Sequence, residues 1–490
     1  MSDRDDMPAF EEIHVISDLH MGGKPGFQIL KETKRLANFI RHVEGLRPAE
    51  RVALVLNGDV IDSLAEDSKH YIAVDDAADV VRRIMRDDAF SCIWDALASF
   101  VHKDKRTLVI VIGNHDIELA LPPVQNLVLK QLAGDDPAAR GRVQFSVAGG
   151  GFACKVGDKR VFCIHGNEVD AWNYNRYEDL ARVSRRLNAG MPFEPERWVA
   201  NAGTRMVKDV MNGVKRRYAW IDLLKPENSA AIGTLMVLDP SQAKKLSSLF
   251  GVVGERIKGK GEVDQRLFDD RFVTAGPDAV SSLSMDRLLG PNLRANFSES
   301  PDDMLRAAEA RRRSGQAGVG QSDSTLGTGQ LIWDRLTGWI RGVEKHEALR
   351  RALKDWLAED RSFDSSDQDQ TYKDVTAAVA DDVDYIVTGH THLARSIEVG
   401  AGRHYLNCGT WIRLIRFTDE MLRDEASFAA VFKVLEKGGM SDIDNASFGG
   451  QKLVLDRTTA ASIGVKGKAV VGQLLSIVGD GSGEPQPFRD

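Results

Sequence analysis

Short apolar runs that end in polar clusters recur along the first part of the chain. The runs at 13–16, 52–56 and 108–112 have the length and composition of buried β-strands. Between them, apolar positions recur at helical spacing at about 36–43 and 77–101. This alternation predicts a mostly parallel sheet whose strands deliver their polar clusters to one common edge.

The pattern changes after residue 150. Apolar runs at 152–156 and 161–164, separated by the turn residues Gly157 and Asp158, predict a β-hairpin. From 171 to 380 the apolar spacing is helical and predicts no strand. Within that region, 314–330 is rich in Gly, Ser, Gln and Thr, which is typical of a mobile loop.

Strand patterns return at 385–387 and 405–411. The remaining residues, 419–490, predict one short helix and a strand at 452–455, followed by a polar tail. We therefore expect an α/β domain formed by 1–170 and 381–418, a mainly helical insertion at 171–380, and a C-terminal extension at 419–490.

Five clusters of metal-binding side chains lie at the ends of these strand patterns. In chain order they are Asp18/His20, Asp59/Asp62, Asn114/His115/Asp116, His165 and His390/His392. Carboxylates, a carboxamide and imidazoles suit Mn²⁺, Fe²⁺ or Zn²⁺, and the absence of thiolates argues against a structural zinc site. Seven ligands exceed the needs of one ion and fit two ions about 3.5–4 Å apart that share a carboxylate.

Composition narrows the class of protein and the compartment in which this site is expected. The net charge of −7 argues against a general nucleic-acid coat protein but allows a local basic groove. Residues 171–320 hold 24 Lys and Arg against 19 Asp and Glu, so they carry +5 and the remainder −12. The four cysteines lack metal-site spacing and predict reduced, mostly buried thiols. No apolar stretch predicts a signal peptide or a transmembrane helix, and we expect a cytoplasmic protein.

The ordered set of motifs resembles the calcineurin-like metallophosphoesterases. The matching motifs are Asp18-x-His20, Gly58-Asp59-x-x-Asp62, Gly113-Asn114-His115-Asp116, His165-Gly166 and Gly389-His390-Thr391-His392. The resemblance covers about 11–166 and 381–412. It implies a four-layer αββα sandwich, here with a large, mainly helical insertion.

The resemblance also implies roles for these residues. One ion would be held by Asp18, His20 and His392, and the other by Asn114, His165 and His390, with Asp59 bridging them. The implied reaction is hydrolysis of a phosphodiester or pyrophosphate bond by a metal-bridging hydroxide, with Mn²⁺ favoured over Fe²⁺ or Zn²⁺.

Further roles concern the residues beside these ligands. His115 is implied to contact the phosphate and help protonate the leaving group, with Asp116 orienting it. Asp62 is expected to fix a ligand imidazole. The alternative for Asp62 and Asp116 is that each caps a helix N-terminus.

The substrate stays open among the branches of the family. Ser63-Leu64 after Asp62, and Asp116 in place of Glu, disfavour the serine/threonine protein phosphatases. The motifs around Asp18, His165 and His390 are similar to those of the UDP-2,3-diacylglucosamine pyrophosphatases, which suggests a nucleotide-sugar lipid. Those enzymes commonly have Arg at the position of His115 and a much shorter insertion. A nuclease of the same superfamily is the alternative.

The insertion suggests how a substrate or partner is recognised. A predicted helix at 172–187 places Arg182, Arg185 and Arg186 on one face, where they could bind a second phosphate or an anionic, lipid-like head group. The alternative is a solvated face paired with acids such as Glu178. A metal-bound scaffold whose insertion is an interaction module is the competing class of function.

Overall fold

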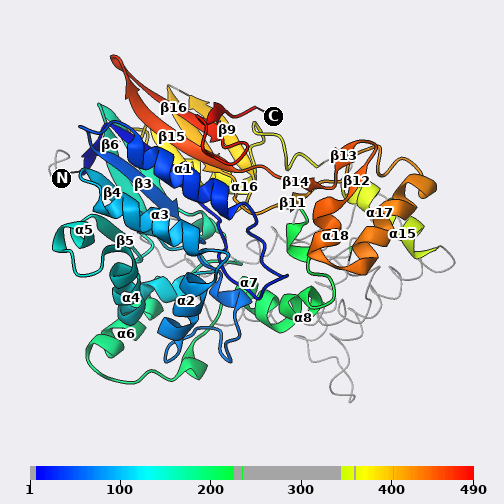
Figure 1. Cartoon of the computed structure of the whole chain (residues 1–490), viewed down its shortest axis with the longest axis horizontal. Coiled ribbons are helices and arrows are strands. Elements are labelled where there is room, and N and C mark those ends of the chain that lie inside the picture. Colours follow the sequence, from blue (N-terminus) through cyan, green and yellow to red (C-terminus); the bar gives the residue numbers. More distant parts are fainter. Residues whose placement is uncertain are drawn as a thin grey trace, which may run out of the picture.

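Two β-sheets lie face to face, with helices on the outer side of each (Figure 1). This arrangement is seen in a computed structural model, which describes residues 7–170, 172–225, 234, 344–357, 360–400 and 402–489. The loop expected at 314–330 lies outside the described residues. The predicted helix at 172–187 is observed as α6, Tyr177–Asn188.

The larger sheet has seven strands in the order β17-β16-β15-β2-β3-β4-β5. Strands β2 to β5 are parallel neighbours, as the sequence predicts, whereas β15 pairs antiparallel with β2. The strands are β2 Glu12–Ile16, β3 Val52–Asn57, β4 Arg106–Val111, β5 Val143–Ser146, β15 Thr459–Lys466, β16 Ala469–Ser476 and β17 Gln486–Pro487.

The smaller sheet has six strands in the order β1-β6-β7-β8-β10-β9. The predicted hairpin is observed as β6 and β7, and β7 then pairs in parallel with β8. The strands are β1 Ala9–Phe10, β6 Phe152–Val156, β7 Lys159–Cys163, β8 Tyr385–Thr388, β9 Ala394–Gly400 and β10 Arg403–Cys408.

The central strands have apolar residues at consecutive positions because one face of each sheet packs against the other sheet and the opposite face packs against helices. In β3, Ala53 and Val55 face the other sheet, while Val52, Leu54 and Leu56 belong to the core beneath the helices. Successive side chains on a strand point to opposite faces, so a strand buried on both sides needs apolar residues at every position.

Helices supply the two outer layers. Those packed on the larger sheet are α1 Thr33–Gly45, α2 Ala77–Arg86, α3 Ser91–His102, α4 Pro122–Ala133 and α5 Pro137–Gly141. The helical region expected at about 77–101 consists of two helices, α2 and α3. On the smaller sheet, α16 (Gln370–Ala378) packs Val375 against Ile386 and Tyr405. The result is the predicted four-layer αββα sandwich, with one outer helix contributed by the region expected to be insertion.

The C-terminal part does not form a separate extension, contrary to the expectation for 419–490. Strand β15 pairs with β2 from Ala461↔Val15 to Gly464↔Glu12 and thus continues the central sheet. Ile463 and Leu474 of this C-terminal hairpin lie in the core between the two sheets.

A second helical cluster lies beside the sandwich, at the right of Figure 1. Its core joins insertion residues such as Trp220 and Leu349 to Phe428 and Leu435 near the C-terminus. The elements around it are α7 Ala202–Met206, α8 Asn212–Lys215, α15 Lys345–Trp356, α17 Glu425–Lys437, α18 Met440–Asn445, β11 Leu414–Ile415, β12 Ser447–Phe448, β13 Gln451–Lys452 and β14 Val454–Leu455.

Ile463→Ala tests whether the C-terminal hairpin is part of the main core. Ile463 is fully buried between the sheets, so the change should lower the free energy of unfolding by about 2–5 kcal/mol. Val471→Ala on the neighbouring strand, where the side chain is 36% exposed, should stay within about 0.5 kcal/mol. Denaturant unfolding measures both. Equal, small effects would mean that the hairpin unfolds separately from the sandwich.

Candidate metal centre

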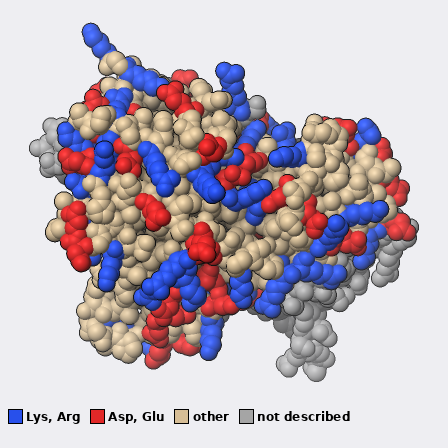
Figure 2. Space-filling model, viewed as in Figure 1, with Lys and Arg blue, Asp and Glu red and all other residues tan. Residues whose placement is uncertain are grey.

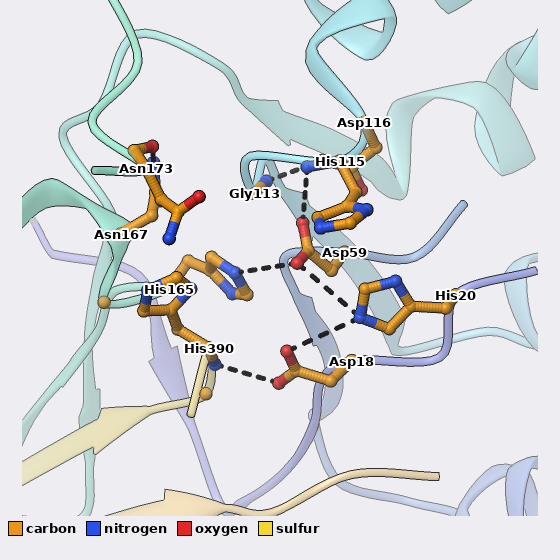
Figure 3. A network of polar contacts seen from close by, with 12 residues as sticks. Asp18, His20, Asp59, Gly113, His115, Asp116, His165, Asn167, Asn173 and His390 are labelled. Atoms are coloured by element: carbon orange, nitrogen blue, oxygen red, sulfur yellow. Dashed lines mark hydrogen bonds and ion pairs between the residues drawn. The ribbon is translucent and has the colours of Figure 1, made fainter. Parts of the chain in front are cut away.

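The five predicted clusters converge at one edge of the sandwich (Figure 3). Asp18 and His20 follow β2, Asp59 follows β3 and Asn114 follows β4. From the other sheet, His165 follows β7, while His390 and His392 follow β8. These strands are parallel to their neighbours, so their carboxyl ends lie together.

Unusual backbone conformations are concentrated in these loops. Five candidate ligands have positive φ angles: Asp18 (56°), His20 (48°), Asp59 (51°), His390 (69°) and His392 (62°). Only two other described non-glycine residues do so. The left-handed conformation costs an L-residue roughly 1–2 kcal/mol, and such strain is concentrated at functional sites.

One group of ligands brings the two sheets together. The Nε2 atom of His392 lies 3.2 Å from Asp18 Oδ1 and 3.0 Å from His20 Nε2. All three side chains are buried, and Asp18, His20 and His392 offer ligand atoms within 4.8 Å of one another. The backbone N–H of His390 donates to the other oxygen, Asp18 Oδ2, over 3.0 Å. This group has the donors and spacing that suit a divalent ion.

A second group, formed by Asp18, Asp59 and His165, shares Asp18 with the first. Asp59 Oδ2 lies 3.3 Å from His165 Nε2 and 3.7 Å from His20 Nε2. The Nδ1 atom of His165 lies 2.8 Å from the Asn57 carbonyl, which can only accept, so Nδ1 carries the hydrogen. The Nε2 atom of His165 therefore faces the Asp59 carboxylate, where both could be ligands of one ion.

The residues present fit bound divalent metal, since several buried ligand atoms lack a hydrogen-bond partner. Atoms without a hydrogen-bond partner include Asp18 Oδ1, Asn114 Oδ1 and His165 Nε2. Each is a good ligand for divalent ions of intermediate hardness. Buried polar groups are normally hydrogen-bonded, so three such atoms in one place indicate a ligand.

The two carboxylates are charged in this setting. Burial would raise the pKa of Asp18, but the His392 imidazole lowers it to about 2. Burial opposes ionisation of Asp59 too, yet His165 and His115 hold its pKa well below the usual value. Conversely, burial lowers the pKa of His165, and the Asp59 carboxylate raises it to about 10. Asp18 and Asp59 are therefore held in their ionised form.

His115 pairs with Asp62, not with the adjacent Asp116. Its Nδ1 atom lies 3.1 Å from Asp62 Oδ1, so Asp62 accepts the Nδ1 hydrogen and orients the ring. This corrects the expectation that Asp116 orients His115. Burial lowers the pKa of His115, but the carboxylates of Asp62 and Asp59 raise it to about 9.

Asp62 combines the two roles considered from the sequence. Besides holding His115, its carboxylate accepts from Ala65 N–H at the start of the short turn Ser63–Ala65. Its Oδ2 atom also lies 3.7 Å from His20 Nδ1. One side chain thus caps a turn and faces two imidazoles of the site.

Asp116 joins two loops of the site. Its carboxylate accepts from the N–H groups of Gly113 (2.6 Å) and Val60 (2.8 Å). Burial and the nearby Asp59 carboxylate raise its pKa to about 7. Asp116 therefore fixes the loop after β4 against the loop after β3.

His390 lies beside His165, with 5.4 Å between the centroids of the two rings. Its Nε2 atom contacts Asp170 Oδ2 at 2.8 Å, and it belongs to none of the three tight His/Asp groups. The three groups are Asp18/His20/His392, Asp18/Asp59/His165 and His20/Asp62/His115. The structure thus groups five of the seven predicted ligands tightly, namely Asp18, His20, Asp59, His165 and His392, and gives His390 a carboxylate partner of its own.

Two residues near the site were not anticipated. Asp170 lies in the loop after His165, and its position five residues after His165 was the only signal for it. Lys225 of the insertion is 4% exposed, and after burial its charge is the largest influence that lowers the pKa of His392, to about 4. No motif surrounds Lys225, so only the fold reveals it.

The three arginines of α6 have local partners. Arg182 and Arg185 pair with Glu178, and Arg182 also pairs with Asp179. Arg186 donates to the carbonyl of Pro192. On the face seen in Figure 2, basic and acidic side chains are intermixed. These contacts match the solvated face considered as the alternative to anion binding.

Two further predictions concern thiols and membranes. All four cysteines are free, and Cys154, Cys163 and Cys408 are buried.

None of the helices in the described ranges combines the length and apolar character needed to span a bilayer.

The two-sheet sandwich with its Asp, Asn and His side chains at one edge defines a metal-dependent phosphoric ester hydrolase. A family model described as calcineurin-like phosphoesterase matches residues 12–213. This range includes Asp18, Asp59 and His165, and it ends before His390 and His392. The match supports the superfamily predicted from the motifs. A comparison with curated proteins found no match.

Proposed function

We propose that this protein hydrolyses a phosphodiester or pyrophosphate bond with the help of two divalent ions, Mn²⁺ being favoured. One observation carries the proposal: the Asp59 carboxylate faces both His165 and His20, at 3.3 and 3.7 Å. A single buried carboxylate between two sets of imidazoles is what a shared ligand requires.

The remaining ligands divide around Asp59. Asp18, His20 and His392 would hold one ion, and Asn114, His165 and His390 the other. When bound, such a pair makes hydroxide available near neutral pH and neutralises charge on the phosphoryl oxygens. The protein itself fixes the ligands: Asn57 sets the hydrogen of His165, and the Asp18 carboxylate anchors the His390 backbone.

His115 supplies the proton for the leaving group. Asp62 accepts the Nδ1 hydrogen and keeps the ring charged, which leaves Nε2–H free to donate to the departing oxygen. The same charged imidazole stabilises the phosphate as negative charge develops.

The substrate class follows from this reaction type. We favour a nucleotide-sugar lipid or a related pyrophosphate, and a nucleic-acid phosphodiester is the alternative.

Metal dependence is the direct test. Chelator-treated protein should not hydrolyse a bis(nitrophenyl) phosphodiester, and added Mn²⁺ should restore turnover. Release of nitrophenolate measures the rate with Mn²⁺, Fe²⁺ and Zn²⁺ in turn. Parallel assays with nucleotides, a nucleotide-sugar lipid and single-stranded DNA then identify the substrate. Metal binding without hydrolysis of any of them would favour the scaffold over the enzyme.

A further inference from the structure

Asp170 connects the start of the insertion to a predicted metal ligand. Its Oδ2 atom lies 2.8 Å from His390 Nε2 and accepts from Asn173 Nδ2 at 2.7 Å. Its Oδ1 atom accepts from the N–H of Trp172 at 2.9 Å. Both oxygens are therefore held, and the carboxylate has a fixed direction.

The contact determines which nitrogen of His390 carries a hydrogen. A carboxylate oxygen at 2.8 Å can only accept, so Nε2 must donate. In the neutral ring, Nδ1 is then the nitrogen with a free lone pair. Metal-bound histidines usually donate their other N–H to a carboxylate or carbonyl in this way.

The backbone of His390 is fixed independently. Its N–H donates to Asp18 Oδ2 over 3.0 Å, and its φ of 69° lies in the left-handed region. The backbone thus comes from the loop after β8, whereas the ring is held from the loop after β7. Among the described residues, Asp170 provides the one carboxylate partner of His390 Nε2.

We propose that Asp170 is a positioning residue that fixes His390 for metal binding through Nδ1 and so sets the affinity for the second ion. The inference rests on the two-ion site proposed above. It also ties the first residues of the insertion to that ion through Asn173 and Trp172. The competing hypothesis is that the metal binds His390 through Nε2 and that Asp170 competes with the metal for this nitrogen. Removal of the Asp170 carboxylate would then strengthen metal binding.

Metal binding by Asp170→Asn distinguishes these arrangements. Titration of metal-free protein with Mn²⁺, followed by calorimetry, should show affinity for one of two ions reduced about 10–100-fold, with the other unchanged. Asp179→Asn is the matched control, because Asp179 is a nearby aspartate that pairs with Arg176 and Arg182 on the surface. Unchanged or tighter binding by Asp170→Asn would overturn the proposal.

A double substitution separates positioning from a general structural role. In a His390→Ala background, Asp170→Asn should have no further effect on metal affinity, because Asp170 acts through the His390 ring. A further loss of similar size in that background would contradict the inference. Wild-type protein that binds fewer than two ions in the same titration overturns the two-ion function itself, whatever the variants show.

Discussion

Asp59→Asn should abolish binding of two metal ions and reduce turnover by more than about a hundredfold. Second-layer substitutions at metal sites already cost 10–100-fold, and Asp59 lies between both ligand groups. The neutral amide removes charge that His165 and His20 both face. Metal content per chain, measured by mass spectrometry after dialysis, reports the first effect, and phosphodiester hydrolysis reports the second.

Asp95→Asn provides the control for this experiment. Asp95 is exposed on α3, away from the strand ends that carry the site. The same change of charge there should leave metal content and rate as in the wild type. If Asp59→Asn retains two ions per chain, a different group bridges them.

His115→Ala should impair catalysis while metal content stays the same. Loss of a general acid typically costs about 10²–10⁴-fold. The loss should be largest for substrates with poor leaving groups and small for a nitrophenyl ester, which leaves without protonation. Rates for a series of leaving groups measure the difference.

Asp62→Asn is the informative companion variant. It keeps the shape of the side chain but weakens its hold on the Nδ1 hydrogen of His115. Asp62→Asn should lower the rate for poor leaving groups more than for good ones, as His115→Ala does, but by a smaller factor. Asp116→Asn should mainly lower the stability of the protein, because the Asp116 carboxylate accepts hydrogen bonds from backbone N–H groups. An equal loss for good and poor leaving groups would exclude the acid role of His115.

The central strands were predictable because the fold covers both of their faces. Burial on both sides requires apolar residues at every position, which gives runs such as 52–56. Polar clusters directly after those runs then had to meet at one edge. The order of the motifs along the chain therefore indicated most of the site.

Strand β15 was missed because its composition is unusual for a core strand. Its first positions, Thr459 to Gly464, are mostly small residues, although Ala460 and Ala461 are fully buried. Close packing explains the choice: a Cβ at Gly472 of the neighbouring β16 would lie 2.2 Å from the Tyr385 ring. Small residues that permit this approach of the two sheets give no apolar run to detect.

The hydrogen-bond partners of the histidines in the site could not be predicted from neighbouring positions in the sequence. Asp116 follows His115 directly, yet the ring contacts Asp62, which is 53 positions away. The contact of His390 with Asp170 spans 220 positions. Loop conformation decides both, since adjacent side chains in a loop point in different directions.

The pairing of β15 with β2 has a consequence for biosynthesis. Strand β2 delivers Asp18 and His20, and one of its two neighbours lies about 450 residues later in the chain, as the pair Val15↔Ala461 shows. During translation the N-terminal ligands therefore emerge long before the strand that completes their sheet. Contacts so distant in sequence form slowly, and an unpaired strand edge favours aggregation. A ribosome that stalls between residues 392 and 461 leaves a nascent chain with all seven predicted metal ligands and an open strand edge, a natural binding site for chaperones.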